Sequence, residues 1–193
     1  MTEAEERQHI RTYLEKKAEW SVWNDTYVSI FQSMGPPIKK RIPNFGNPEA
    51  VAAYYTKKGS PYTGDPVWGA GDHYLHPNRF YMALENGTWR SNYIDCDDIA
   101  GFAHIACQMI PGVRSKVVTL FDRYIKGSHV ICVGTDAYGR TFAIDTNGFR
   151  WLPDLDEATL CRVWRALYLN PAIGQDFDYK YAIDTPYPFS NVA

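Results

Sequence analysis

The stretch that begins at Asp95 most constrains the fold of this 193-residue chain, because it has the pattern of an amphipathic helix with a cysteine in its first turn. Apolar or small residues recur at the spacing of one buried helix face, namely Ile99, Phe102, Ala103, Ala106 and Met109. Pro111 and Gly112 then stop the helix. The sequence therefore predicts a helix that carries Cys96 at its start.

The position of Cys96 suggests a nucleophile that requires a partner base to lose its proton. The positive end of a helix dipole favours a thiolate, which is the reactive form of cysteine. Three carboxylates in the same turn oppose ionisation, those of Asp95, Asp97 and Asp98. A partner base would therefore be required. The chain offers His129 within the apolar run 128–133, followed by Asp145 at the end of the run 141–145.

Beyond the cysteine helix, the hydrophobic pattern changes from a helical period to short β-branched runs. Residues 116–121, 128–134, 140–144 and 149–152 read as strands, with a turn around 136–139 and the hairpin dipeptide Asn147–Gly148. Residues 156–169 read as a helix, and the aromatic tail from residue 177 as a strand. We expect an α+β fold with an antiparallel sheet of at least three strands built from residues 113–152.

The N-terminal third is predicted to be helical. A capping box at Thr2 and Glu5 starts a helix at residue 3 that runs to about residue 33. Asn47 and Pro48 start a second helix that ends near residue 58, and Pro77 starts a third. Residues 60–75 read as a long loop, a kind of segment that is often functional. Chain length predicts one domain over 1–193.

The strand pattern also predicts a contact between two polar residues. If residues 136–138 form a three-residue loop, His129 and Asp145 lie directly opposite each other on neighbouring strands. Asp145 could then orient the imidazole toward a thiol. A loop of two or four residues would place His129 opposite position 146 instead.

Composition narrows the functional classes. The net charge is −2, the N-terminus is polar, and no apolar run is long enough to span a membrane. We therefore expect a cytoplasmic protein that binds neither nucleic acid nor membranes. The four cysteines are too scattered for a disulfide framework, and no metal or cofactor is expected. Cys107, Cys132 and Cys161 are expected in the core, and His104 at the surface.

Short motifs upstream of the cysteine carry a family resemblance. The chain is similar to the bacterial transglutaminase-like cysteine proteinase group, a transglutaminase-like branch of the papain-type cysteine peptidases. The family patterns are Tyr-x-x-Asp, Asp-x-aromatic-x-x-Pro, a Gly, and Asp-Cys-x-Asp-x-Ala. The matching positions here are Tyr62, Asp65, Asp72, Tyr74, Pro77, Gly87, Asp95, Cys96, Asp98 and Ala100.

The resemblance covers about residues 60–152. It leaves an N-terminal helical extension, 1–59, and a C-terminal helix and tail, 153–193. The chain departs from the family pattern at Tyr74, where a Trp is common, and at Ile94, where a Gly precedes the Asp-Cys pair. It also has extra sequence at 88–93.

The resemblance implies a papain-like fold and acyl transfer through a Cys96–His129–Asp145 triad and a thioester, on a protein or peptide substrate. It also implies a bacterial or phage origin. Candidates for the second oxyanion donor or for substrate contacts are Trp68, Tyr74, Trp89 and Asn92.

Two alternatives stay open. One is a cell-wall peptidoglycan amidase or endopeptidase, a group that usually has Asp-Cys-Ser-Gly-Phe where this chain has Asp-Cys-Asp-Asp-Ile. The other is a catalytically idle structural or binding member, for instance in a phage or an effector.

Overall fold

A five-stranded antiparallel sheet forms the centre of the molecule in the computed structural model, which describes residues 1–32, 42–59, 74–88, 94–122, 128–170, 175–176 and 178–189. Side chains within α1 are described as far as residue 23. The strand order is β4-β3-β2-β1-β7. The strands are β1 (Arg114–Asp122), β2 (Ser128–Thr135), β3 (Thr141–Asp145), β4 (Gly148–Trp151) and β7 (Tyr179–Thr185).

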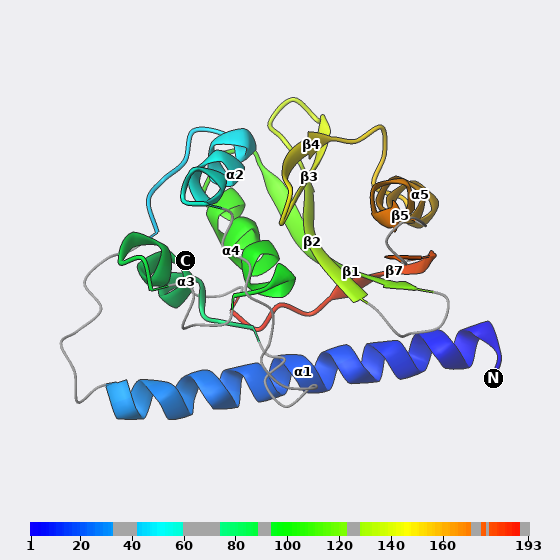
Figure 1. The fold of residues 1–193 in the computed structure, drawn as a ribbon, viewed down its shortest axis with the longest axis horizontal. Coiled ribbons are helices and arrows are strands. Elements are labelled where there is room, and N and C mark those ends of the chain that lie inside the picture. The colour runs from blue at the N-terminus through cyan, green and yellow to red at the C-terminus, as the bar shows by residue number, and fades with distance from the viewer. Residues whose placement is uncertain are drawn as a thin grey trace.

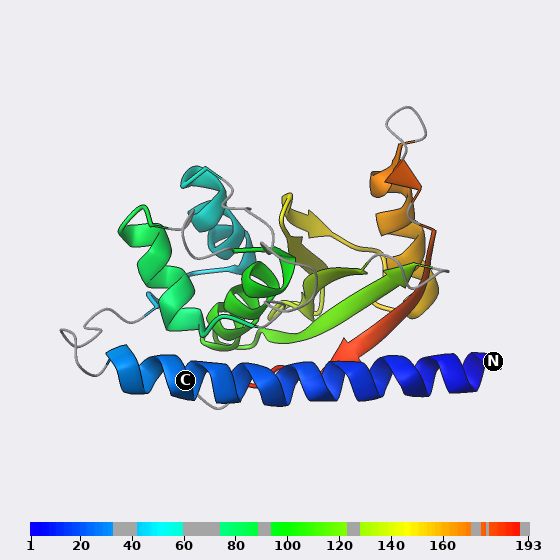
Figure 2. The same ribbon diagram turned by 60° about the horizontal axis from the view of Figure 1, so that its bottom comes forward.

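Five helices are described around this sheet: α1 (Glu3–Gln32), α2 (Pro48–Lys57), α3 (Pro77–Glu85), α4 (Cys96–Gln108) and α5 (Glu157–Tyr168). A short ladder pairs β5 (Leu169–Asn170) with β6 (Gln175–Asp176). Helices α2, α3 and α4 lie to one side of the sheet and α5 to the other, while α1 runs along the outside of the molecule (Figures 1 and 2). The predicted α+β class is confirmed, as are the antiparallel pairs β1–β2 and β2–β3.

The helices begin where their capping residues place them. The Thr2 and Glu5 side chains exchange bonds with each other's main-chain N–H groups, and the Asn47 side chain accepts from Ala50 N. The hairpin at Asn147–Gly148 also forms, with Gly148 at φ +103°. Strand β7 confirms the strand expected in the tail.

Strand alternation divides the apolar residues between two cores. Val130 and Cys132 of β2 face the larger cluster under α4, whereas Ile131 and Val133 face the cluster under α5. A third cluster joins α1 to the sheet edge through Ile10, Leu14, Phe121, Tyr181 and Ile183. Cys107, Cys132 and Cys161 are buried, as expected.

The prediction that His104 lies at the surface was wrong, because its side chain is buried. Its ring packs edge-on against Tyr187 at 5.7 Å, and its Nδ1 lies 2.9 Å from Ser115 Oγ. Burial lowers the pKa of His104 to about 4. Gly101, one turn earlier, leaves room for the Tyr187 ring, because a Cβ there would lie 2.4 Å from it.

Among the described residues, no helix combines the length and the apolar character that crossing a membrane requires.

Candidate active site

A capping box fixes Cys96 as the first residue of α4. The Asp95 side chain accepts from the N–H of Asp97 at 3.1 Å, and Asp98 Oδ2 accepts from the N–H of Asp95 at 3.3 Å. Cys96 is half-buried, whereas the other three cysteines of the chain are buried. The predicted position of this thiol at a helix start is therefore confirmed.

His129 and Asp145 meet in the structure, although not by the predicted register. His129 Nε2 lies 3.1 Å from Asp145 Oδ2. Strand β2 pairs with β3 through Cys132 opposite Ile144 and Val133 opposite Ala143. The predicted direct pairing of His129 with Asp145 was therefore wrong by two residues.

The shift has a local cause in the turn between β2 and β3. This turn spans residues 136–140, because Thr135 pairs with Thr141. Asp136 organises it: its Oδ1 accepts from the N–H groups of Tyr138 and Arg140, at 3.0 and 2.8 Å. A five-residue turn preserves the side-chain parity that a three-residue turn would give. The imidazole and the carboxylate consequently remain diagonal neighbours on one face.

The Asp145 carboxylate is completely buried and held by several donors. Trp164 of α5 donates its indole N–H to the same Oδ2 at 2.9 Å, and the main-chain N–H of Asn147 donates to Oδ1 at 2.9 Å. Tyr55 of α2 donates its hydroxyl to the Asp145 carbonyl. Burial, the largest influence, would raise the pKa of Asp145, but the bonds from His129, Trp164 and Asn147 outweigh it and lower that pKa.

These contacts define which imidazole nitrogen can act as a base. With the proton on Nε2, His129 donates to Asp145, and Nδ1 keeps a lone pair. Tyr168 closes the same side, with its hydroxyl 3.4 Å from Nε2 and its ring centroid 5.0 Å from that of His129. The arrangement therefore leaves Nδ1 as the nitrogen that could accept a proton.

The Cys96 thiol lies at the start of β2, the strand that carries His129. Burial raises its pKa, and Asp95 and Asp97 raise it further, while the N–H of Val130 lowers it. Cys96 packs against the cluster on the α4 side, whereas His129 faces α5 with Asp145. The thiol contacts the main chain one residue after His129, and its charge would raise the pKa of Tyr168, whose hydroxyl lies 3.4 Å from His129 Nε2.

A buried lysine of α1 faces the acidic turn beside Cys96. Lys17 Nζ lies 2.6 Å from Asp97 Oδ2, with side chains that are 8% and 1% exposed. Ser21, one turn later, accepts from the N–H of Tyr74 at 2.9 Å. The charge of Lys17 lowers the pKa of Cys96. Sequence reasoning missed this residue, because nothing in the polar pattern of α1 distinguishes Lys17 from its exposed neighbours.

Among the residues that the structure describes, the three carboxylates of this turn form a group that could hold a cation. One oxygen from each of Asp95, Asp97 and Asp98 lies within 4.8 Å of the others. Burial, followed by the charge of Asp97, raises the pKa of both Asp95 and Asp98. Capping bonds hold Asp95 and Asp98, and Asp97 forms the ion pair with Lys17.

Of the other predicted site residues, the structure describes only Tyr74. Tyr74 is 1% exposed and lies in the core under α4, with its ring 5.4 Å from that of Tyr187 and 4.9 Å from Lys17 Nζ. Trp68, Trp89 and Asn92 lie outside the described residues.

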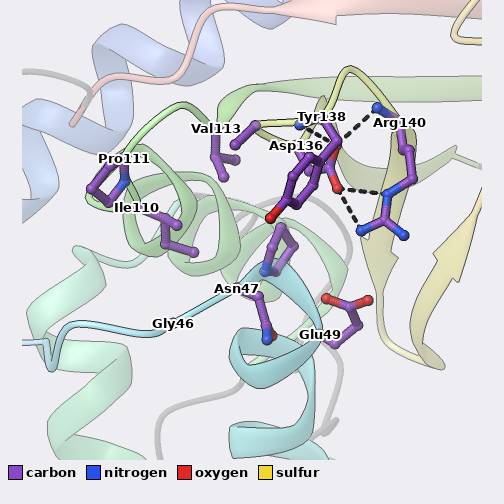
Figure 3. Close-up of a pocket in the computed structure, with 11 residues that line it drawn as sticks. Gly46, Asn47, Glu49, Ile110, Pro111, Val113, Asp136, Tyr138 and Arg140 are labelled. Atoms are coloured by element: carbon purple, nitrogen blue, oxygen red, sulfur yellow. Dashed lines mark hydrogen bonds and ion pairs between the residues drawn. The ribbon is translucent and has the colours of Figure 1, made fainter.

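A hollow of about 340 Å³ lies at the opposite end of α4 (Figure 3). It is lined by Asn47, Glu49, Pro111, Tyr138 and Arg140, among others, and Arg140 is held there by Asp136. A 13-residue helix is about 20 Å long. The hollow is therefore separate from Cys96, and none of the three predicted triad residues lines it.

Comparison of the chain with models of protein families, with curated proteins and with solved structures finds no significant match.

Proposed function

We propose that this protein is a transglutaminase-like cysteine hydrolase or acyltransferase, in which Cys96 is the nucleophile, His129 the base and Asp145 the residue that orients the base. The observation that carries the proposal is the bond from His129 Nε2 to the buried Asp145 carboxylate at 3.1 Å. A histidine held in this way has a fixed tautomer, and its other nitrogen is available for proton transfer.

In the proposed reaction, the thiol proton of Cys96 passes to His129 Nδ1, and the sulfur attacks the carbonyl carbon of an amide. The tetrahedral intermediate carries an oxyanion, for which the Cys96 N–H at the helix start is one donor. The C–N bond then breaks, and the leaving amine takes the proton from His129. Water or a second amine attacks the resulting thioester, gives its proton to His129 and releases the sulfur.

Because the pKa of Cys96 is raised, the base has to remove the thiol proton. In the resting site, burial and the neighbouring carboxylates keep the thiol neutral, so the thiolate has to form as the proton leaves for His129. Lys17 favours the thiolate, and Trp164 holds the Asp145 carboxylate that stabilises the imidazolium. The site therefore supports a base-assisted cysteine rather than a preformed ion pair.

Iodoacetamide alkylation, followed by peptide mapping, tests this assignment in the native protein. Cys96 should react well before Cys107, Cys132 and Cys161, because it is the half-buried one of the four. His129→Ala should slow alkylation of Cys96 at neutral pH, since the base is then absent, and should leave the rate at Cys161 unchanged. A Cys96 rate that does not depend on His129, or that is no faster than the other three, would contradict the proposal.

A further inference from the structure

The hollow at the far end of α4 is a candidate binding site that the proposed reaction does not use. Its volume of about 340 Å³ falls within the range of pockets that hold small molecules, roughly 300–1,000 Å³. Three segments enclose it: the start of α2, the turn after α4, and the turn between β2 and β3 (Figure 3). Because it is built from the ends of ordered elements, the site exists before a ligand binds.

The wall of the hollow on the α4 side is apolar. Ile110, Pro111 and Val113 follow α4 and provide aliphatic surface. Tyr138 is 86% exposed and extends from the β2–β3 turn over the hollow (Figure 3). A ligand chain that lies here would therefore meet aliphatic groups and an aromatic ring.

The positive charge of Arg140 is compensated within the hollow. Its Nε and Nη2 lie 2.8 and 2.7 Å from Asp136 Oδ2. The ring centroid of Trp151 lies 4.0 Å from the central carbon of the guanidinium. The carboxylate and the indole therefore already occupy most of the groups with which Arg140 could bind an anion.

The start of α2 is equally unsuited to an anion. The Asn47 side chain accepts from Ala50 N at 2.8 Å, and Pro48 has no N–H to donate. The carboxylate of Glu49 follows in the same turn and would repel a negative ligand. This helix start therefore differs from those that bind phosphate through free N–H groups.

Glu49 carries the charge that remains in the hollow. It is half-buried, and its carboxylate has no hydrogen-bond or ion-pair partner among the residues that the structure describes. In Figure 3 this carboxylate points from α2 toward the β2–β3 turn. The first turn of a helix favours an acidic residue, but that interaction leaves the carboxylate oxygens able to accept hydrogen bonds. The hollow therefore has one uncompensated negative charge beside an apolar wall.

We propose that the hollow binds a primary alkylamine, with the ammonium group against Glu49 and the alkyl chain along Ile110, Pro111 and Val113. An ammonium group on a partly desolvated carboxylate forms charge-assisted hydrogen bonds. The ring of Tyr138 adds an aromatic face, which attracts a cation and covers methylene groups. The same chemistry occurs in free amines and in the lysine side chains of proteins.

Nuclear magnetic resonance titration of the isotope-labelled full-length protein, at constant pH, tests the ligand class. We expect n-pentylamine and Nα-acetyl-lysine N-methylamide to cause saturable shifts of the main-chain signals of Glu49, Val113 and Tyr138. Nα-acetyl-norleucine N-methylamide has an alkyl chain without the ammonium group, so it should bind at least about tenfold more weakly. Binding of pentylamine alone would assign the site to free amines, and binding of the lysine derivative alone would assign it to a protein ligand.

Three results of this titration would overturn the proposal. They are the absence of saturable shifts with both amines, equal binding of the norleucine derivative, and shifts with inorganic phosphate but with neither amine.

Glu49→Gln tests the residue on which the proposal depends, because it removes the charge and keeps the shape. It should raise the dissociation constant of each amine that binds by about tenfold. Glu15→Gln is the matched control, since Glu15 is exposed on α1 and does not line the hollow, and it should leave this constant unchanged. Tyr138→Ala should weaken binding about threefold. The spectrum of each variant checks that it folds. An amine affinity that Glu49→Gln leaves unaltered, or that Glu15→Gln reduces equally, would contradict the assignment.

Discussion

Asp145 is the residue on which the candidate site depends most. It is completely buried, and its carboxylate accepts from an imidazole, an indole and a main-chain N–H. An ionised carboxylate in such a position is tolerated because several donors compensate for the lost hydration. Only a substitution that keeps the shape of the Asp145 side chain can therefore separate its role in holding His129 from its role in the fold.

Asp145→Asn is that substitution, and it should reduce turnover by about 10³- to 10⁴-fold, as in serine-type triads that lose the same carboxylate. The asparagine can offer an N–H to the imidazole and stabilise the wrong tautomer. The rate of acyl transfer to a peptide ester or amide measures the effect. Turnover equal to that of the wild type would remove Asp145 from the mechanism.

The same substitution has a stability effect whose sign follows from the pKa. Because the pKa of Asp145 is lowered in the folded state, its charge contributes stability above the unfolded value of about 3.9, and this contribution is lost as pH falls. We expect Asp145→Asn to lower the free energy of unfolding at pH 7 by about 1–3 kcal/mol. The difference from the wild type should shrink near pH 3, as denaturant titrations at both pH values would show. A constant difference would contradict the linkage.

At the scale of elements, one contact joins α1 to the start of α4. Local sequence patterns could not predict it. Lys17 and Asp97 form an almost dry ion pair, at 2.6 Å, between helices far apart in sequence. Removing one partner of such a pair leaves an uncompensated buried charge, which is the expensive outcome. The pair therefore couples the anchoring of α1 to the turn that carries Cys96.

Lys17→Met should destabilise the protein by about 3–5 kcal/mol, since Asp97 would stay buried without its cation. Arg11→Met is the control on the same helix, because Arg11 is exposed and should change stability by less than about 0.5 kcal/mol. Chemical denaturation measures both. A Lys17→Met protein as stable as the Arg11→Met control would show that Asp97 does not depend on the lysine.

Capping residues and short turn motifs made much of the secondary structure predictable. The pairs Thr2–Glu5 and Asn47–Pro48 marked helix starts, and Asn147–Gly148 marked a hairpin. Such signals depend on neighbouring residues, so they can be recognised without knowledge of the fold. Helix α1 also runs without a break from Glu3 to Gln32, close to the predicted end near residue 33.

Turn length and non-local burial were harder to predict. The turn between β2 and β3 contains five residues because the Asp136 side chain accepts from main-chain N–H groups later in the turn. The length of this turn could not be predicted from the sequence. His104 is buried by Tyr187 from the C-terminal segment, which no helical period reveals. Trp164 is buried in α5, and its bond to Asp145 depends on how α5 packs against the sheet, which the sequence does not reveal.

At the scale of the whole molecule, the candidate site draws on both faces of the sheet. Helix α4 brings Cys96 from one face, and α5 brings Trp164 and Tyr168 to His129 and Asp145 from the other. The site thus lies where β2 begins, between two separate cores. The three residues of the proposed triad come from three elements, α4, β2 and β3.

Trapping of an acyl-enzyme is the most direct test of the proposed nucleophile and base. We expect p-nitrophenyl acetate to release a burst of nitrophenol and to leave one acetyl group on Cys96 of the wild type, detected by intact mass and peptide mapping. The burst should be absent in Cys96→Ala and strongly slowed in His129→Ala. Acetylation at other residues only, or a burst that neither substitution changes, would contradict the account.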